Sequence, residues 1–126
     1  MANSWLNAYV LHRRPYRETS FIVDFFTLEL GRVSAVARGV RSAKSDRRSL
    51  LQPFQALRVQ LSGKSDLKNL TQLESNGALR MLTGNALYCA LYVNEITNRV
   101  LPGGVEAAEL YSAYATALAA LQPEQA

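Results

Sequence analysis

Five short stretches of apolar, β-branched and aromatic residues constrain the fold of this chain more than any other feature. Turn-forming residues separate the stretches, and no long helical period lies between them. They predict strands at residues 5–12, 19–30, 32–38, 54–61 and 68–74. The leucines around the last stretch lie three residues apart, which fits a turn of helix almost as well as a strand.

Glycine and proline mark the expected ends of these strands. Pro15 cannot donate a ladder hydrogen bond, so residues 13–16 are expected to end the first strand. Gly31 can adopt a positive φ, so residues 29–32 are expected to form a hairpin turn. Residues 62–66 are rich in Ser, Gly, Lys and Asp and are expected to form another turn.

The hydrophobic period changes near Thr83, which predicts a helix. The expected buried face of this helix comprises Leu82, Ala86, Cys89, Val93, Ile96 and Val100. Further apolar residues surround that face, so the helix is expected to be buried, with Cys89 as an inert thiol. Tyr88 and Tyr92 are expected to pack between this helix and the strands.

A second helix is expected after Pro102 and two glycines end the first. Glu106 and Glu109 would lie in its first turn, where the helix dipole favours acidic side chains. Its apolar stripe would comprise Leu110, Tyr114, Ala117 and Leu121. Two helices cannot cover so much apolar surface alone, so the chain is expected to be a fragment or short form of a longer protein.

These elements predict a mainly β chain with added α structure. The expected fold is an N-terminal five-stranded OB-fold barrel followed by the start of an α-helical domain. The expected division is an OB-fold nucleic-acid-binding domain at residues 1–80 and a partial α-helical domain, a helical hairpin, at residues 81–126. An SH3-like barrel is the alternative for the first part.

Basic residues are concentrated in the first part of the chain. Residues 1–80 carry 13 Lys and Arg against 6 Asp and Glu, whereas residues 81–126 carry 1 against 4. Net charges of +7 and −3 point to a polyanionic partner, most often nucleic acid. A membrane surface is not expected, because no basic amphipathic helix accompanies the charge and no apolar run approaches about 18 residues.

The segment 31–53 carries most of the candidate DNA contacts. Residues 40–49 have little apolar content and are expected to form a solvated loop that presents arginine forks to phosphates. The expected DNA-binding residues are Arg38, Arg41, Lys44, Arg47 and Arg48, with Arg14, Arg32 and Lys64 as outer support and Tyr16 as an exposed ring. The alternative is an ordinary solvated loop, with DNA bound elsewhere on the barrel.

No pattern in the sequence predicts an enzyme. His12 has no patterned metal or general-base partners, and Glu18, Asp24 and Glu29 form no evident catalytic pair. No phosphate-cradling glycine motif is present. The single cysteine can form neither an internal disulfide nor a Cys-based zinc site, and it fits a reducing cytoplasm. No catalytic residue, metal or cofactor is therefore expected.

Ordered short motifs over residues 5–101 carry a family resemblance. They are Trp5, Ala8, Val10-Leu11, Arg14-Pro15, Glu18-Thr19-Ser20, Phe26-Thr27, Gly31-Arg32-Val33, Ala37-Arg38-Gly39 with Arg41, Leu51-Gln52-Pro53-Phe54, Leu87-Tyr88, Leu91-Tyr92 and Asn94-Glu95. With these motifs the chain resembles the N-terminal part of bacterial RecO, a family of DNA repair and recombination mediators.

The resemblance implies binding of single- and double-stranded DNA, annealing of complementary strands and assistance in recombinase loading in the RecF pathway. It implies RecR and the C-terminal tail of single-stranded DNA-binding protein as partners, and a cytoplasmic, nucleoid-associated location. Many family members carry a Cys-rich zinc site beyond position 126, and zinc is not carried over to this chain. Two other functions stay open: an adaptor that recognises an acidic peptide tail, and an RNA-binding OB-fold factor.

Overall fold

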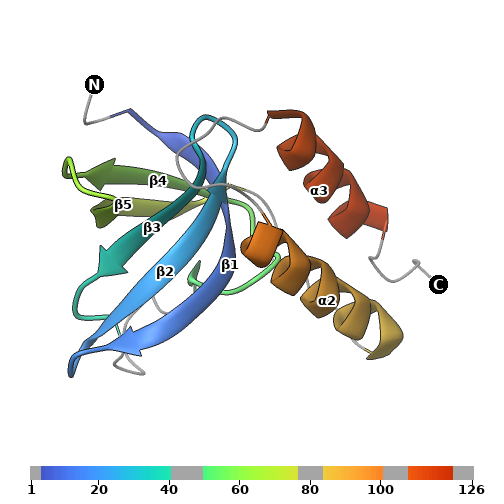
Figure 1. Ribbon diagram of the computed structural model, residues 1–126, viewed down its shortest axis with the longest axis horizontal. Helices are drawn as coiled ribbons and strands as arrows, with labels where there is room; N and C mark the ends of the chain where they lie inside the picture. Colours follow the sequence, from blue (N-terminus) through green and yellow to red (C-terminus); the bar gives the residue numbers. More distant parts are fainter. Residues whose placement is uncertain (1–3, 41–49, 77–83, 101–107, 121–126) are drawn as a thin grey trace.

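The computed structural model describes residues 4–40, 50–76, 84–100 and 108–120. A closed barrel has the strand order β1-β2-β3-β5-β4. Its strands are β1 (Leu6–Tyr16), β2 (Ser20–Thr27), β3 (Gly31–Ala37), β4 (Leu57–Ser62) and β5 (Leu67–Ser75). Helices α2 (Gly84–Val100) and α3 (Ala108–Ala120) lie together on one side of the barrel (Figure 1). The predicted OB-fold barrel followed by helices is confirmed.

β5 closes the barrel, so the segment with leucines three residues apart is a strand. It pairs antiparallel with β4 and parallel with β3. The register shifts between two neighbouring pairs: Gln60 lies opposite Gln72, whereas Leu61 lies opposite Leu70. The extra residue in β5 places Leu70 and Leu73 on the same side of the strand, facing the interior. A bulge therefore explains the helix-like spacing in the sequence.

The barrel core is made by the apolar faces that alternation predicted. β4 buries Leu57, Val59 and Leu61 between the more exposed Arg58 and Gln60. β3 places Val33, Ala35 and Ala37 in the barrel core, and Val36 on its other face is also buried. The buried residues of the barrel core are Leu6, Ala8, Val10, Phe21, Val23, Phe25, Val33, Ala35, Ala37, Val40, Leu51, Leu57, Val59, Leu61 and Leu70.

A second cluster joins the helices to the outside of the barrel. We call it the helix–barrel cluster; its buried members are Tyr9, Leu11, Phe26, Phe54, Ala90, Tyr114 and Leu118. Phe26 explains why β2 is apolar on both faces: Phe25 points into the barrel core, and Phe26 lies against the rings of Tyr111 and Tyr114. The helices therefore cover apolar side chains that would otherwise face solvent.

The expected turns at residues 29–32 and 62–66 are confirmed, whereas the expected ends of β1 and β4 differ from the structure. Gly31 has φ 69° and follows a turn at residues 28–30. β1 does not stop before Pro15, because β2 pairs with it through Tyr16, while β4 pairs with β1 only at Leu6–Ala8. Pro15 therefore lies where β1 has one neighbouring strand, a position that tolerates proline. Phe54, with φ 73°, precedes β4 and places its ring in the helix–barrel cluster.

The expected buried face of α2 is wrong at Cys89 and Ile96, which are exposed, whereas Ala86 and Val93 are partly buried, and Leu82 and the Val100 side chain lie outside the described residues. Tyr88 and Tyr92 are 72% and 68% exposed and do not pack between helix and barrel, and Cys89 is exposed. The buried positions are instead Ala90, Asn94 and Thr97. The physical reason is that α2 packs against β1 and bonds to its backbone carbonyls, which a partly polar face can do and an apolar face cannot.

Of the expected stripe of α3, Tyr114 is buried and Ala117 is half-buried. Its buried residues are Tyr114 and Leu118, with Tyr111 and Ala115 partly buried beside them. Leu110 is 43% exposed, and Leu121 lies outside the described residues. Tyrosine rings at positions 111 and 114 decide the orientation, because they form ring contacts with Tyr9 and Phe26 that Leu110 cannot make. Glu109 lies in the first turn, as predicted.

The attachment of α3 is expected to weaken at alkaline pH. Burial raises the pKa of Tyr114 well above its usual value of 10.0, and the neighbouring Tyr9 raises it further. The unfolded chain therefore loses this proton first, so stability is full below about pH 10 and falls as the pH rises further, by up to about 1.4 kcal/mol per pH unit. Denaturant unfolding at pH 9 and pH 11 measures the loss. Tyr114→Phe should show a smaller loss; an equal loss would contradict this assignment.

Candidate nucleic-acid interface

A bulge in β1 decides which of its basic side chains face solvent. Val10 lies opposite Phe25, but the next pair is His12 with Asp24, so Leu11 is the extra residue. After the bulge, Arg13 points inward, where its Nη1 donates to the Leu51 carbonyl at 2.9 Å. Alternation then places His12, Arg14 and Tyr16 on the outer face.

The outer face brings Arg14, Tyr16 and Arg38 to one end of the barrel. Tyr16 lies opposite Ser20 on β2. The pairing of β2 with β3 ends at Phe21 and Ala37, and Arg38 is the next residue of the chain. Ser20 is only 7% exposed. In the β1–β2 turn, the guanidinium of Arg17 lies 5.0 Å from the centroid of the Tyr16 ring.

The β4–β5 turn adds Lys64 to the same end. The Arg38 Nη2 donates to Asn69 Oδ1 at 3.3 Å. Asn69 lies at the start of β5, opposite Ser62, and the turn that carries Lys64 connects the two strands. Lys68 Nζ donates to the Gly63 carbonyl of that turn at 3.2 Å. We call this surface the basic end of the barrel: Arg14, Tyr16, Arg17, Arg38 and Lys64.

The other predicted contacts are not at the basic end or are not described. Arg32 is the second residue of β3, and Arg38 follows the end of that strand six residues later, a separation of about 20 Å if the chain is extended. It therefore lies toward the opposite end of the barrel. Arg41, Lys44, Arg47 and Arg48 lie outside the described residues. The segment that carries them begins after Val40, which is buried in the barrel core.

Tyr16 and Arg17 differ from their sequence-based interpretation. Tyr16 is half-buried rather than fully exposed, because the Arg17 side chain lies over its ring. Arg17 was not predicted as a DNA contact. It is exposed in the turn between β1 and β2, where it has φ 56°. The sequence indicates this position through Pro15 and the polar residues after it, which mark a turn.

The acidic residues at the basic end limit its positive potential. Glu18 is exposed in the β1–β2 turn and Asp66 in the β4–β5 turn. Both turns therefore carry a cation and a carboxylate at close range. Their geometry favours local phosphate contacts by arginine forks over a broad positive field.

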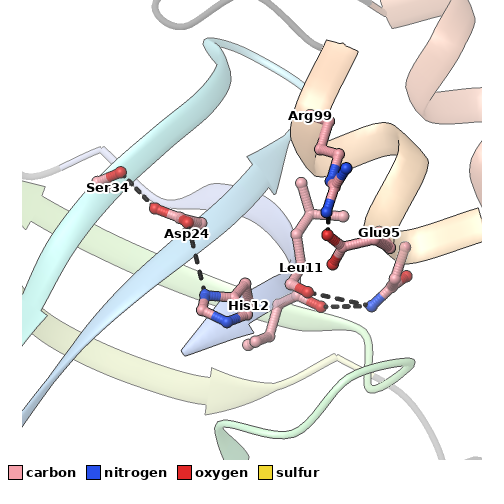
Figure 2. Close-up of polar contacts among 8 residues, drawn as sticks. Leu11, His12, Asp24, Ser34, Glu95 and Arg99 are labelled. Atoms are coloured by element: carbon pink, nitrogen blue, oxygen red, sulfur yellow. Dashed lines mark hydrogen bonds and ion pairs between the residues drawn. The ribbon is translucent and has the colours of Figure 1, made fainter. Parts of the chain in front are cut away.

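A serine, an aspartate and a histidine meet on the outer face next to the basic end (Figure 2). Ser34 Oγ donates to Asp24 Oδ1 at 2.5 Å, and His12 Nδ1 lies 3.9 Å from Asp24 Oδ2. The carboxylate lies between the hydroxyl and the imidazole. A serine nucleophile needs the imidazole in direct contact with its hydroxyl, so this order of groups does not activate Ser34.

A groove of about 250 Å³ separates β1 from α2, beside His12. Its lining residues are Val10, Leu11, His12, Arg13, Pro53, Leu91, Asn94 and Glu95. The Glu95 carboxylate accepts a hydrogen bond from Arg99 Nε at 2.7 Å, on the helix that forms one wall (Figure 2). Groups of both signs line the groove, so it has no preference for a phosphate.

Within the described ranges, no three His, Cys, Asp or Glu side chains gather as they would around a metal ion. Among the same residues, no helix combines the length and the apolar character needed to cross a bilayer.

Two family models match successive parts of the chain. The model described as "Recombination protein O N terminal" matches residues 1–78, and the one described as "Recombination protein O C terminal" matches residues 81–126.

Curated relatives are similar over nearly the whole chain. DNA repair protein RecO of Alteromonas mediterranea is 67% identical over 124 residues, which is 98% of this chain and 53% of that protein. The protein of the same name from Pseudoalteromonas atlantica is 59% identical, covering 96% of this chain and 50% of that protein. The one from Marinobacter nauticus is 50% identical, covering 90% and 46%. The chain therefore spans about half the length of these relatives.

Proposed function

Because the chain belongs to the RecO family of DNA repair proteins, we propose that it binds DNA through the basic end of its barrel, without catalysing a reaction. In this proposal residues 1–80 form the nucleic-acid-binding domain and residues 81–126 begin a helical domain. Cellular location would be the cytoplasm, at the nucleoid.

The observation that carries the proposal is the position of the basic end on the barrel. OB-folds bind oligonucleotides on the face of strands 2 and 3 and on the loops that join strands 1–2 and 4–5. Arg38 directly follows the last residue of β3, Arg17 lies in the first of these loops, and Lys64 lies in the second. The same surface offers the Tyr16 ring, although Arg17 already lies over one of its faces.

The wider activity of the family forms the second part of the proposal. We infer that the protein binds single- and double-stranded DNA, anneals complementary strands and assists recombinase loading. RecR and the C-terminal tail of single-stranded DNA-binding protein would be its partners. Family membership supports this part, and the chain spans about half the length of these relatives.

A binding role fits the chemistry of the outer face better than catalysis does. The Ser34–Asp24–His12 arrangement lacks contact between hydroxyl and imidazole. The Ser34–Asp24 hydrogen bond has a structural role, because Asp24 is only 8% exposed and the Ser34 hydroxyl donates to one of its carboxylate oxygens.

A salt titration of binding to single-stranded DNA, duplex DNA and RNA of one sequence tests the proposal. If about five phosphates are neutralised on a single strand, the logarithm of the binding constant should fall against the logarithm of salt with a slope near −3.5. Contacts to the backbone read little sequence, so a second DNA sequence should bind with nearly the same affinity.

Three outcomes distinguish the proposal from its alternatives. A slope near zero, or binding that depends strongly on DNA sequence, would contradict backbone recognition by the basic end. Markedly tighter binding to RNA would favour the RNA-binding alternative. Binding of an acidic peptide with no measurable binding of either nucleic acid would favour the adaptor.

A further inference from the structure

The Asn94 side chain connects α2 to the bulge of β1. Its Nδ2 donates to the carbonyl of Val10 at 3.3 Å and to the carbonyl of Leu11 at 3.4 Å. Asn94 is only 3% exposed, and it lines the groove between β1 and α2 together with Val10 and Leu11. The Tyr114 hydroxyl of α3 donates to Asn94 Oδ1, which holds the amide in one orientation.

These two carbonyls belong to the residues at which the register of β1 shifts. A bulge disrupts the hydrogen-bond ladder, and a buried carbonyl without a donor is costly. The Asn94 amide supplies a donor to both carbonyls from outside the sheet, beside the bridge that Val10 forms with Pro53. It therefore stabilises the bulged form of β1 relative to a strand without the shift.

The bulge determines the direction of every β1 side chain that follows it. Without the extra residue, strand alternation would reverse, so Arg14 would point inward and Arg13 outward. In the bulged form, Arg13 contacts Leu51 and Phe21 inside the barrel, and Arg14 is exposed at the basic end. The position of Arg14 thus depends on a backbone feature that lies three residues away.

We propose that Asn94 is a positioning residue for the DNA interface: it holds the β1 bulge in the form that presents Arg14 and Tyr16 on the outer face. This inference rests on the proposed function of the basic end. The proposal also gives a role to the buried Asn94 side of α2. Because α2 packs against β1 there, the helix holds the strand that carries Arg14 and Tyr16.

The test replaces Asn94 by Leu in the complete chain, which keeps a similar volume and removes the donor. Thr97→Val is the matched control, because Thr97 is also buried on α2 but its hydroxyl bonds only to the Val93 carbonyl of the same helix. Tyr114→Phe is a milder variant that keeps the Asn94 amide and removes the hydroxyl that donates to its Oδ1. Circular dichroism measures the folded fraction of each variant, and the variants are compared under conditions in which each is fully folded.

Two readouts separate positioning from general destabilisation. Amide hydrogen exchange should accelerate at residues 10–14 in Asn94→Leu and less in Tyr114→Phe, with no local change in Thr97→Val. Affinity for a single-stranded oligonucleotide at low salt should fall roughly tenfold in Asn94→Leu. Its salt slope should become shallower by about 0.7, the value of one phosphate contact.

The exchange readout does not depend on DNA, so failure of this inference is distinguishable from failure of the proposed function. Unchanged exchange at residues 10–14 in folded Asn94→Leu would overturn the inference even if the parent binds DNA. Accelerated exchange with unchanged affinity and slope would also overturn it, because the bulge would then not control the contacts. Absence of DNA binding by the parent would instead refute the proposed function.

Discussion

Phe26→Ala is expected to lower the free energy of unfolding by about 3–5 kcal/mol, a large part of the total stability of a domain of this size. Phe26 is fully buried although it lies on the outer face of β2. Its ring centroid lies 5.3 Å from that of Tyr111 and 5.6 Å from that of Tyr114, both in edge-on geometry. The substitution removes these contacts and leaves a cavity between barrel and helix.

Tyr92→Ala is the matched control for Phe26→Ala. It also removes an aromatic ring, but Tyr92 is 68% exposed on α2, so the expected change is within about 0.5 kcal/mol. Urea unfolding of both variants measures the two values under the same conditions. Equal losses for the two variants would mean that α2 packs through its tyrosine face and that the described helix orientation is wrong.

The contrast between the exposed Tyr92 and the buried Phe26 shows the limit of hydrophobic periodicity as a guide to burial. Alternation located the strands and the interior of the barrel, because that interior accepts only apolar side chains. The helix faces could not be located in this way. α2 is apolar around most of its circumference, and its contact face combines the hydrogen bonds of Asn94 to β1 with the packing of Leu87, Ala90 and Val93.

Bulges are the second reason that part of the fold could not be predicted. In β1 the extra residue Leu11 changes which of two consecutive arginines faces solvent. In β5 an extra residue brings Leu70 and Leu73 to the same side and imitates a helical period. A bulge is selected by pairing with another strand, so residue spacing within one strand does not reveal it.

The candidate site was predictable in part for the same reasons. Arg14, Arg38 and Lys64 were identified by charge alone, and the structure brings them to one end of the barrel. Arg32 was identified by the same criterion, yet strand length places it toward the other end. Charge therefore predicted the kind of partner, whereas the barrel topology determines which charges can act together.

Replacing Arg14, Arg38 and Lys64 together by alanine is expected to weaken binding of single-stranded DNA on the order of a hundredfold at low salt. The reason is the loss of about three phosphate contacts, which should also make the salt slope shallower by about 2. Fluorescence anisotropy with a labelled oligonucleotide, repeated at several salt concentrations, measures both quantities. None of the three side chains belongs to the barrel core, so the variant should unfold at nearly the parent's denaturant midpoint.

The matched control removes Arg58 and Arg99, which are cations away from the basic end. Arg58 is paired with Glu74 on the β4–β5 face, and Arg99 is paired with Glu95 on α2. Their removal lowers the net charge without removing a proposed contact. Only a small loss of affinity is therefore expected, from reduced long-range attraction that salt largely screens.

A second triple variant, Arg41, Lys44 and Arg47 to alanine, assigns the remaining contacts. If the segment after Val40 also binds phosphates, the salt slope of this variant should become shallower by about 2, as expected for the basic-end variant. If this variant alone loses affinity, the DNA contacts lie in that segment and the assignment of Arg14, Arg38 and Lys64 is wrong. If the basic-end variant alone loses affinity, DNA binds on the outer face of β1 to β3 and the segment 41–49 is an ordinary solvated surface. Loss in both variants is the expected result, because Arg38 and Val40 connect the basic end directly to that segment.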